Sequence, residues 1–377
     1  MEQKRLGDIA TYINGFAFKP EDRGTVGLPI IRIQDLTGNA YDLGFYDGNY
    51  PERIEINNGD VLISWSASLG VYVWNKGKAL LNQHIFKVAF NKCEVNREYF
   101  VYAVRYKLKE MESKTHGATM KHIVKKDFDN TLIPFPSLDE QKKIADLLDK
   151  ASAILLARQQ QLQKLDELVK GRFVEMFGSP ITNPLSWEKR NLKEVCVKLN
   201  DGTHFSPESF DTGEYKYITA KNIKLSGFDF SNITYVSEKV HRPIYERCNP
   251  EFEDVLYIKD GATTGIAIVN TLKEEFTLLS SVALLKQDRT IMNGYFLAAL
   301  LNNKDMYLDI RSNMGGAAIT RLTIAKLNSI KVIVPPIELQ EQFAAFVQQV
   351  NKSKSVVQKA LDEAQLLFDS LMQQYFG

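Results

Sequence analysis

The second half of the chain repeats the first half, and this duplication constrains the fold more than any other feature of the sequence. Short matches recur in the same order at an offset that drifts slowly along the chain. The matched pairs are Asn14-Gly15 with Asp201-Gly202, Asp60-Val61-Leu62 with Asp254-Val255-Leu256, Tyr99-Phe100 with Tyr295-Phe296, Gly117 with Gly316, Leu138, Glu140 and Gln141 with Leu339, Glu341 and Gln342, and Phe177-Gly178 with Phe376-Gly377. An ordered series of this kind indicates a tandem duplication.

Each copy reads as a mixed α/β body followed by one long helix. Short β-branched and aromatic runs, such as Val61 to Trp65 and Val255 to Ile258, predict strands, and Gly, Asn and Asp clusters between them predict turns. Tyr99 to Met111 and Tyr295 to Met306 are expected to be helical. The predicted organisation is a first body at 1–136, a long helix at 137–178, a second body at 179–336 that opens with a linker at 179–186, and a second long helix at 337–377.

The two long helices carry apolar residues at heptad spacing. Ser137 and Glu140 predict a capping box at the start of the first helix, and Gly178 before Ser179-Pro180 ends it. The expected pairing residues are Leu148, Leu155, Leu162, Val169 and Met176 in the first helix, and Phe343, Val350, Val357, Leu361 and Leu371 in the second. Alternating steps of three and four residues are typical of a coiled coil.

Two arrangements of these helices are open. Each helix could pack only on its own body, or the two could pair with each other in antiparallel orientation. Forty residues of helix span about 60 Å, more than one body needs for its own core. The second arrangement is therefore favoured, with the helix pair separating two bodies in a pseudo-two-fold molecule.

Bulk composition excludes several classes of protein. The 377 residues include 47 basic and 46 acidic residues, so the net charge is only +1 and any nucleic-acid surface must be local. No apolar run is long enough to span a bilayer, and the first residues lack the apolar core of a signal peptide, so we expect a cytoplasmic protein without membrane contact. Cys93, Cys196 and Cys248 are too scattered for a zinc knuckle.

Basic, glycine-containing loops occur at matching places in the two copies. Residues 105–126 hold seven basic residues against two acidic ones, and residues 304–331 hold five against two. Such loops suit phosphate contacts, while amide, guanidinium and hydroxyl groups beside them can read base edges. The candidate DNA-binding residues here are Ser113, Lys114, His116, Thr119, Lys121 and His122 in the first copy, and Arg311, Asn313, Thr320 and Arg321 in the second.

Further candidates are polar residues beside the expected strands, although each could be only a turn or a strand face. They are Lys19, Arg32, Gln34, Trp65, Ser66, Ser68, Thr203, His204, Lys221, Asn222, Lys259, Thr263 and Thr264. The two copies differ most at these positions and agree in the framework. Two similar scaffolds with different polar tips would read two different sequences.

Catalytic motifs are absent from the sequence. There is no Gly-rich phosphate loop with a following Lys, no adenine-methyltransferase motif, and no histidine spacing that suits a metal. A lone Glu214-Tyr215-Lys216 is too common to indicate a nuclease. We therefore expect no catalytic residue and no metal site in this chain.

The order and duplication of these motifs resemble the specificity subunits of Type I restriction-modification enzymes. The resemblance covers essentially the whole chain and is carried by Asp60-Val61-Leu62, by residues 117–123, by residues 133–141 and by residues 334–342. It implies that each half reads one part of a split target in double-stranded DNA and that the helices fix the spacing between the parts. It also implies that two methyltransferase subunits dock on the helices, bind S-adenosylmethionine and methylate adenine N6, and that restriction subunits join to cleave DNA with ATP and magnesium.

Other interpretations remain open from the sequence. The chain could be an interaction scaffold, in which the bodies bind other proteins and the helices form a rod. A self-contained nuclease is motivated only by the α/β bodies. Sequence-selective, salt-sensitive DNA binding distinguishes the first interpretation from the scaffold.

Overall fold

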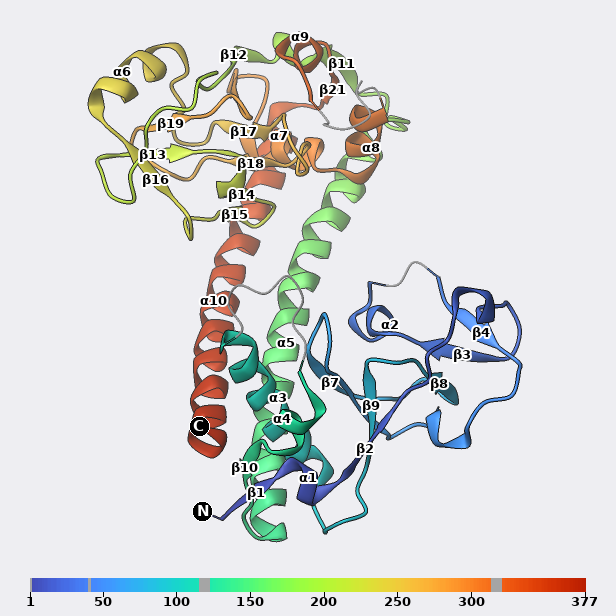
Figure 1. Ribbon diagram of the computed structural model, residues 1–377. Coiled ribbons are helices and arrows are strands. Elements are labelled where there is room, and N and C mark those ends of the chain that lie inside the picture. The colour runs from blue at the N-terminus through green and yellow to red at the C-terminus, as the bar shows by residue number, and fades with distance from the viewer. Residues whose placement is uncertain (1, 40–41, 115–122, 313–320) are drawn as a thin grey trace. The chain divides into compact units, whose positions relative to one another are not determined.

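The computed structural model describes residues 2–39, 42–114, 123–312 and 321–377, and these residues form two compact units (Figure 1). Unit 1 comprises Met1–Gln159 together with Ala360–Gly377, and unit 2 comprises Gln160–Lys359. Both boundaries fall inside long helices, α5 (Leu138–Phe177) and α10 (Ile337–Phe376). Each unit therefore contains part of both helices.

Unit 1 is built on two four-stranded sheets. The first is antiparallel, with the order β2 (Thr11–Asn14), β9 (Ile85–Ala89), β6 (Val61–Ser64) and β7 (Gly70–Val73). The second has the order β4 (Gly44–Tyr46), β3 (Leu28–Ile31), β8 (Ala79–Leu81) and β5 (Glu55–Ile56), and its central strands β3 and β8 are parallel. The remaining elements are β1 (Gln3–Arg5), which pairs with β10 (Leu132–Pro134), and the helices α1 (Leu6–Ile9), α2 (Ile33–Thr37), α3 (Arg97–Lys114) and α4 (Lys125–Asp129).

Unit 2 repeats this plan. Its antiparallel sheet has the order β12 (Cys196–Asp201), β20 (Val282–Gln287), β17 (Val255–Ile258) and β18 (Ala267–Val269). Its second sheet has the order β16 (Thr234–Val236), β13 (Tyr215–Ile218) and β19 (Phe276–Leu278), and β13 and β19 are again parallel. The smaller pairs are β14 (Ile223–Lys224) with β15 (Gly227–Phe228) and β11 (Glu188–Asn191) with β21 (Lys331–Val334), and the helices are α6 (Glu238–Arg247), α7 (Gly294–Leu301), α8 (Lys304–Ser312) and α9 (Ile324–Asn328).

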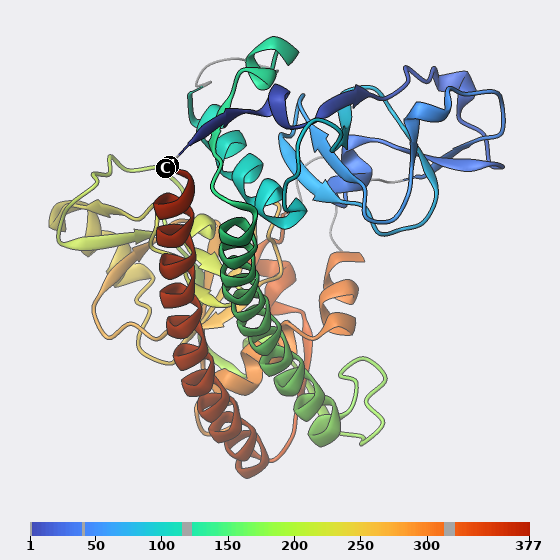
Figure 2. The same cartoon turned by 90° about the horizontal axis from the view of Figure 1, so that it is seen from below.

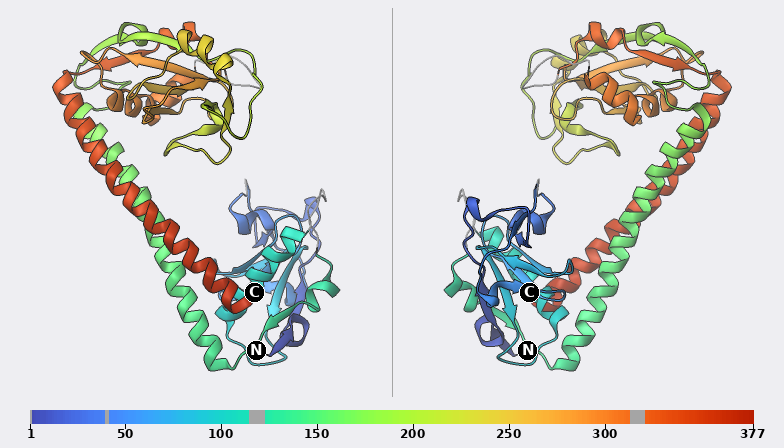
Figure 3. Two further views of the ribbon diagram at one scale, coloured as in Figure 1. Left: turned by 90° about the vertical axis from the view of Figure 1, so that its left-hand side faces the viewer. Right: turned by 90° about the vertical axis from the view of Figure 1, so that its right-hand side faces the viewer.

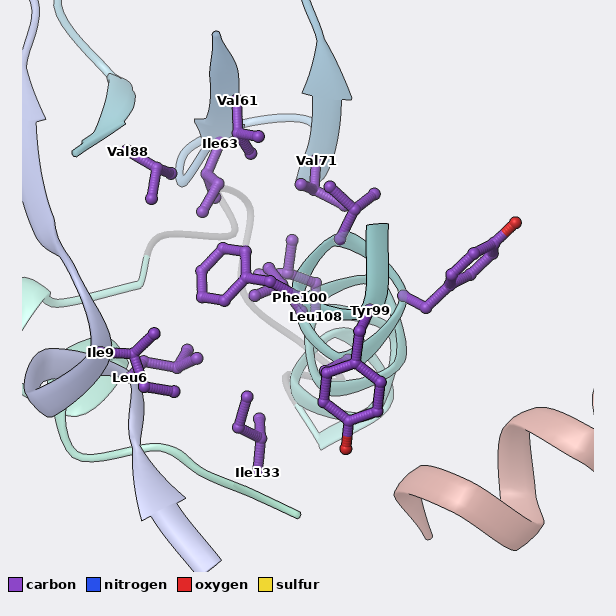
Figure 4. Packing of buried hydrophobic residues seen from close by; sticks show 14 of the residues in the cluster. Leu6, Ile9, Val61, Ile63, Val71, Val88, Tyr99, Phe100, Leu108 and Ile133 are labelled. Carbon is purple, nitrogen blue, oxygen red and sulfur yellow. The ribbon is translucent and has the colours of Figure 1, made fainter. Parts of the chain in front are cut away.

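Strand β6 is buried on both faces, which explains why its sequence is a continuous apolar run and does not alternate between apolar and polar residues. Val61 and Ile63 face a cluster that contains Phe100 of α3, as Figure 4 shows, whereas Leu62 belongs to a second cluster against the other sheet. A strand that is covered on both faces needs apolar side chains at every position. The mixed α/β class and the strands predicted at Val61 and Val255 are confirmed.

The long helices pair in antiparallel orientation within each unit. In unit 1, Ile144 and Leu148 of α5 share a buried cluster with Met372 and Phe376 of α10. In unit 2, the carboxyl-terminal part of α5 packs against Phe343 of α10. The segments of the two helices lie side by side in Figures 2 and 3 as well, so the predicted antiparallel pairing is confirmed.

All the predicted heptad residues of the two helices are at least partly buried. Leu148, Leu155, Phe343, Val350 and Val357 are buried, and Leu162, Val169, Met176, Leu361 and Leu371 are half-buried. Among the described residues no helix combines the length and the apolar character that crossing a bilayer requires.

The structure corrects the register of the repeat at the start of the long helices. The side-chain oxygen of Gln141 accepts a 2.9 Å bond from the backbone N–H of Asn96, and Gln340 accepts the same bond from Asn293. Gln141 therefore corresponds to Gln340 and not to Gln342, and the predicted match is wrong by two residues. Sequence alone could not choose because glutamine occurs at both positions of the second helix.

The helix expected at Tyr295 to Met306 is interrupted at Asn302 and Asn303. Asn302 turns its side-chain amide to the backbone of Ala267 in β18, with bonds of 2.7 and 3.0 Å. Asn303 then caps the next helix by accepting from the backbone N–H of Asp305 at 3.0 Å. Two helices, α7 and α8, result.

Candidate nucleic-acid interface

In each unit, polar side chains gather where the two parallel strands end. In unit 1 the strands β3 and β8 pair in parallel, with Ile31 beside Leu81, so the residues that follow them meet at one edge of the sheet. These are Arg32 to Gln34 at the start of α2 and Asn82 to His84. The turn after β6 joins them, since the backbone N–H of Trp65 donates to the carbonyl of His84 at 3.2 Å. We call Arg32, Gln34, Trp65–Ser68 and Asn82–His84 the unit 1 edge.

Unit 2 builds the same edge with the same backbone hydrogen bonds. The bond from the N–H of Asn82 to the carbonyl of Ile31 corresponds to that from Leu279 to Ile218. Three more backbone bonds of unit 1 have counterparts in unit 2. The bond from Gln83 to Phe16 corresponds to that from Ser280 to Thr203, and the bond from Trp65 to His84 to that from Lys259 to Ser281. The bond from Ile123 to Trp65 corresponds to that from Leu322 to Lys259. The unit 2 edge is therefore Thr219, Lys221, Lys259–Thr263 and Leu279–Ser281.

The equivalence extends to the turns beside these bonds. A side-chain oxygen caps the first turn in both units, because Asp35 accepts from the N–H of Arg32 at 2.8 Å and Asn222 accepts from Thr219 at 3.0 Å. Ala67, with φ 59°, occupies the position of Gly261, with φ 103°. A non-glycine residue in this conformation is uncommon and concentrates at functional sites.

The unit 1 edge encloses a hollow of about 370 Å³. It is lined by Arg32, Ile33, Gln34, Thr37, Asn39, Ala67, Asn82, Gln83 and His84. Arg32 is paired with Asp35 at 3.0 Å and with Asp42 at 3.6 Å, so its guanidinium shapes the hollow. The other polar groups are mostly amides, which present both a donor and an acceptor.

The unit 2 edge is organised around a buried lysine. Lys259 is only 1% exposed, and its ammonium lies 2.8 Å from a carboxylate oxygen of Asp260 and 3.4 Å from one of Asp201. His204 and Arg321 approach the outer sides of these carboxylates, at 3.1 Å from Asp201 and 3.5 Å from Asp260. A buried ion pair with several partners fixes side-chain positions, so this cluster holds the turn after β17 in place.

The structure corrects four predicted DNA contacts. Thr203, Asn222, Lys259 and Thr264 are all buried. The Lys259 ammonium is bound to carboxylates, and the Thr264 hydroxyl donates to the carbonyl of Gly261 at 2.7 Å. The buried position of these four side chains gives them a role in supporting the edge. The sequence could not show this, because Asp201 is remote from Lys259 along the chain.

The other predicted residues divide by exposure. Lys19, Gln34, Ser68, His204, Lys221, Thr263 and Arg321 are exposed, and Arg32, Trp65, Ser66 and Arg311 are half-buried. His116, Thr119, Lys121, His122, Asn313 and Thr320 lie outside the described residues, as do the side chains of Ser113 and Lys114. Helices α3 and α8 precede the residues outside the description, and Ile123 and Leu322, which follow those residues, bond back to the two edges.

Sequence reasoning missed two groups at the interface. One is Asn82, Gln83 and His84, which the repeat could have revealed because they follow the strand equivalent to β19. The other is α6, which stands where unit 1 has only a short turn at Glu52–Ile54. Its residues Lys239 and Arg247 line a second hollow of about 630 Å³ in unit 2, together with Thr203, His204, Phe205, Val240, Pro243 and Ile244.

Acidic and metal-ligating side chains are not grouped as a metal would require. Across residues 2–39, 42–114, 123–312 and 321–377, no three of His, Cys, Asp or Glu come together as a candidate metal site. The chemistry that the two edges offer is hydrogen bonding and charge, which are the means by which proteins read base edges and phosphates.

Comparison with known proteins places these features in context. The model of the Type I restriction modification DNA specificity domain matches residues 1–167 and 184–365. The chain is 24% identical over 398 residues to the Type I restriction enzyme EcoBI specificity subunit of Escherichia coli, covering 98% of this chain and 83% of the relative. It is 22% identical to the MjaVIII specificity subunit of Methanocaldococcus jannaschii, covering 82% and 78%.

Solved structures share the fold. The S subunit of a Type I restriction-modification system from M. genitalium superposes with a TM-score of 0.59 at 16% identity, over 100% of this chain and 96% of that one. A chain from a structure that describes complex assembly and conformational transition of the type I R-M system gives a TM-score of 0.55 at 18% identity, over 99% and 97%.

Proposed function

This chain belongs to the Type I restriction modification DNA specificity family, and from that premise we propose that it is the DNA-reading subunit of such a system. Its two units read the two parts of a split target in double-stranded DNA. The chain itself carries out no chemistry. Adenine methylation, with S-adenosylmethionine, and cleavage, with ATP and magnesium, belong to partner subunits in the cytoplasm.

One observation carries this proposal: the two edges share a backbone frame and differ in their side chains. Equivalent hydrogen bonds hold Gln83 and Ser280, and Trp65 and Lys259, in the same places. Two copies that read the same bases would be expected to keep the same side chains at these positions. Sequence readers need this combination, because the frame fixes the register on DNA and the side chains select the bases.

The long helices support docking of methyltransferase subunits. On α5, Leu147, Ile154 and Leu168 follow heptad spacing one residue before the pairing positions and are 39%, 51% and 50% exposed. On α10, Val356 and Leu366 are each 71% exposed. Apolar side chains that recur on a solvent face are typical of an interaction surface.

The direct test is a map of methylated adenines in a cell that carries this chain together with the adenine methyltransferase subunit of its system. We expect an interrupted motif whose two parts are separated by unspecified bases, and its loss when this chain is deleted. Methylation that stays random, or follows a continuous motif, would contradict a split reader.

A measurement of DNA binding by the purified complex distinguishes the DNA reader from the interaction scaffold. A DNA reader gives sequence-selective binding whose affinity falls steeply with salt, because lysine and arginine contacts to phosphate release counterions. A scaffold whose helices bind proteins shows no such dependence.

A further inference from the structure

Two side chains of the unit 1 edge are free to contact a base. Gln34 and Gln83 come from different segments, and both are exposed and line the same hollow. Among the described residues, none hydrogen-bonds to either side-chain amide. Their polar neighbours are engaged, since Asn39 donates to Thr37 at 3.2 Å and Asn82 accepts from the N–H of Gln83 at 2.9 Å.

The backbone frame identifies the residues that stand at these positions in unit 2. The first turn is capped at Arg32 in unit 1 and at Thr219 in unit 2, so Gln34, two residues on, corresponds to Lys221. The N–H of Gln83 donates to the carbonyl of Phe16 as that of Ser280 donates to Thr203, each at 2.8 Å, so Gln83 corresponds to Ser280. Lys221 is exposed.

The two sets of side chains suit different base pairs. A glutamine amide donates and accepts at once, which matches the N7 acceptor and N6 amino donor of adenine in the major groove. A lysine ammonium only donates, which matches the two acceptors of guanine, N7 and O6, and is not satisfied by the amino group of adenine. At the two matched positions unit 1 has amides, whereas unit 2 has the ammonium of Lys221 and the hydroxyl of Ser280.

We infer that the unit 1 edge specifies an A·T pair through Gln34 and Gln83, and that the unit 2 edge specifies a G·C pair through Lys221. The inference rests on the proposed function and adds to it the class of base pair that each half requires. The buried cluster around Lys259 then acts as support in unit 2, leaving Lys221 as the base contact.

The test uses the complete complex of this chain with its methyltransferase subunits, and reads the target motif by mapping methylated adenines. The variants are Gln34→Ala, Gln83→Ala and Lys221→Ala. Removing a good bidentate contact relaxes discrimination at one base pair by about 5- to 140-fold. We expect Gln34→Ala and Gln83→Ala to relax an A·T position in one half of the target, and Lys221→Ala to relax a G·C position in the other half.

Exchange variants sharpen the result. Gln34→Lys places the unit 2 side chain on the unit 1 frame and should move the preference at that position from A·T towards G·C, while Lys221→Gln should do the reverse. All of these side chains are exposed, so the thermal midpoint of each variant should equal that of the wild type. Gln3→Ala, at an exposed glutamine of β1 away from the edge, is the matched control and should leave the motif unchanged.

The outcomes separate this inference from the proposed function. If the wild-type complex methylates no defined motif, the proposed function itself fails. If the motif is defined but the glutamine variants leave every base preference intact, or weaken all sequences equally as a phosphate contact would, the assignment of Gln34 and Gln83 is overturned and the function stands. A G·C pair at the position that Gln34→Ala relaxes would also overturn it.

Discussion

In each unit one glycine, Gly15 or Gly202, allows its strand segment to pass close to the backbone of the edge. A Cβ added to Gly15 would lie 2.0 Å from the carbonyl oxygen of Asn82, and one added to Gly202 would lie 1.9 Å from that of Leu278. Nothing but hydrogen fits at these distances. The glycines set the position of the segment that carries Gln83 in unit 1 and Ser280 in unit 2.

We therefore expect Gly15→Ala to lower the free energy of unfolding of unit 1 by about 1 to 3 kcal/mol, the usual cost of overpacking, and to weaken reading of only one half of the target. Urea denaturation and methylation mapping measure the two effects. Gly171→Ala is the control, because a Cβ in that helix position meets nothing within 4 Å. It should stabilise the chain by up to about 1 kcal/mol. Equal effects of both changes would contradict the close-approach argument.

A buried histidine makes the stability of unit 2 depend on pH. The ring of His241 stacks on Tyr215 with centroids 3.8 Å apart and hydrogen-bonds to Thr277 at 2.9 Å. Burial lowers the pKa of His241 and outweighs the opposing effect of Glu275, 3.2 Å away. Arg242, which donates to Glu275 at 2.8 Å, also disfavours a second positive charge there.

Because the unfolded chain binds the proton more readily than the folded one, the stabilising effect of neutral His241 is complete above about pH 6.5 and is lost as the pH falls below that value. We expect the thermal midpoint of unit 2 to drop between pH 7.5 and pH 5. In His241→Gln this drop should be smaller, since glutamine does not titrate. Parallel pH profiles for the two proteins would rule out His241 as the cause.

At the scale of elements, four aromatic rings join the long helices to unit 2. Phe177 of α5 lies 4.7 Å from Phe296 of α7 and 5.6 Å from Phe343 of α10, and Phe173 stacks on Phe296 at 5.7 Å. All four side chains are almost fully buried. The cluster explains why the carboxyl end of α5 belongs with unit 2.

Phe343→Ala should lower the free energy of unfolding of unit 2 by about 3 to 5 kcal/mol, because a buried ring is lost and a cavity remains. Val356→Ala, on the same helix at a side chain that is 71% exposed, should change it by less than about 0.5 kcal/mol. Guanidinium denaturation of the two variants makes the comparison. A similar cost for both would show that the rings do not anchor the helix.

The sequence predicted the elements whose signals are local. Heptad spacing predicted both long helices, and apolar runs predicted the strands on either side of the core. Helix α6 was missed because Pro243 lies inside it, and an interior proline argues against a helix. The break between α7 and α8 was also missed, because it depends on the contact of Asn302 with β18, which only the folded chain forms.

The candidate site could be predicted only in part for the same reason. Gln34 and Lys221 were found as polar residues after apolar runs, and they are exposed. Lys259 follows an apolar run as well, but two carboxylates surround it and it is buried. Which side of a turn faces water depends on these distant partners.

At the scale of the whole molecule, the length of the helices should set the spacing of the target. One heptad adds about 10 Å to a helix, which corresponds to about three base pairs at 3.4 Å each. We expect a heptad inserted after Gln159 together with one inserted after Lys359 to lengthen the unspecified gap by up to about three base pairs. Methylation mapping should show both halves of the motif unchanged.

A single insertion, in α5 alone, is the control for this prediction. It moves one helix out of register with the other, so it should destabilise the protein instead of producing a new spacing. If the paired insertion alters the bases within either half, or leaves the gap as it was, the helices do not act as the spacer.

The boundaries of the units fall inside α5 and α10. As a consequence, unit 2 can finish folding on the ribosome before unit 1. Unit 2 is one continuous stretch, from Gln160 to Lys359, and can close its core as soon as that stretch has emerged. Unit 1 includes residues from both ends of the chain, so its core is incomplete until Phe376 has been synthesised. Phe376 is fully buried against Tyr99, with ring centroids 5.2 Å apart. Domains usually finish folding in the order of their synthesis. Here the half that is translated first must wait for the last residues of the chain.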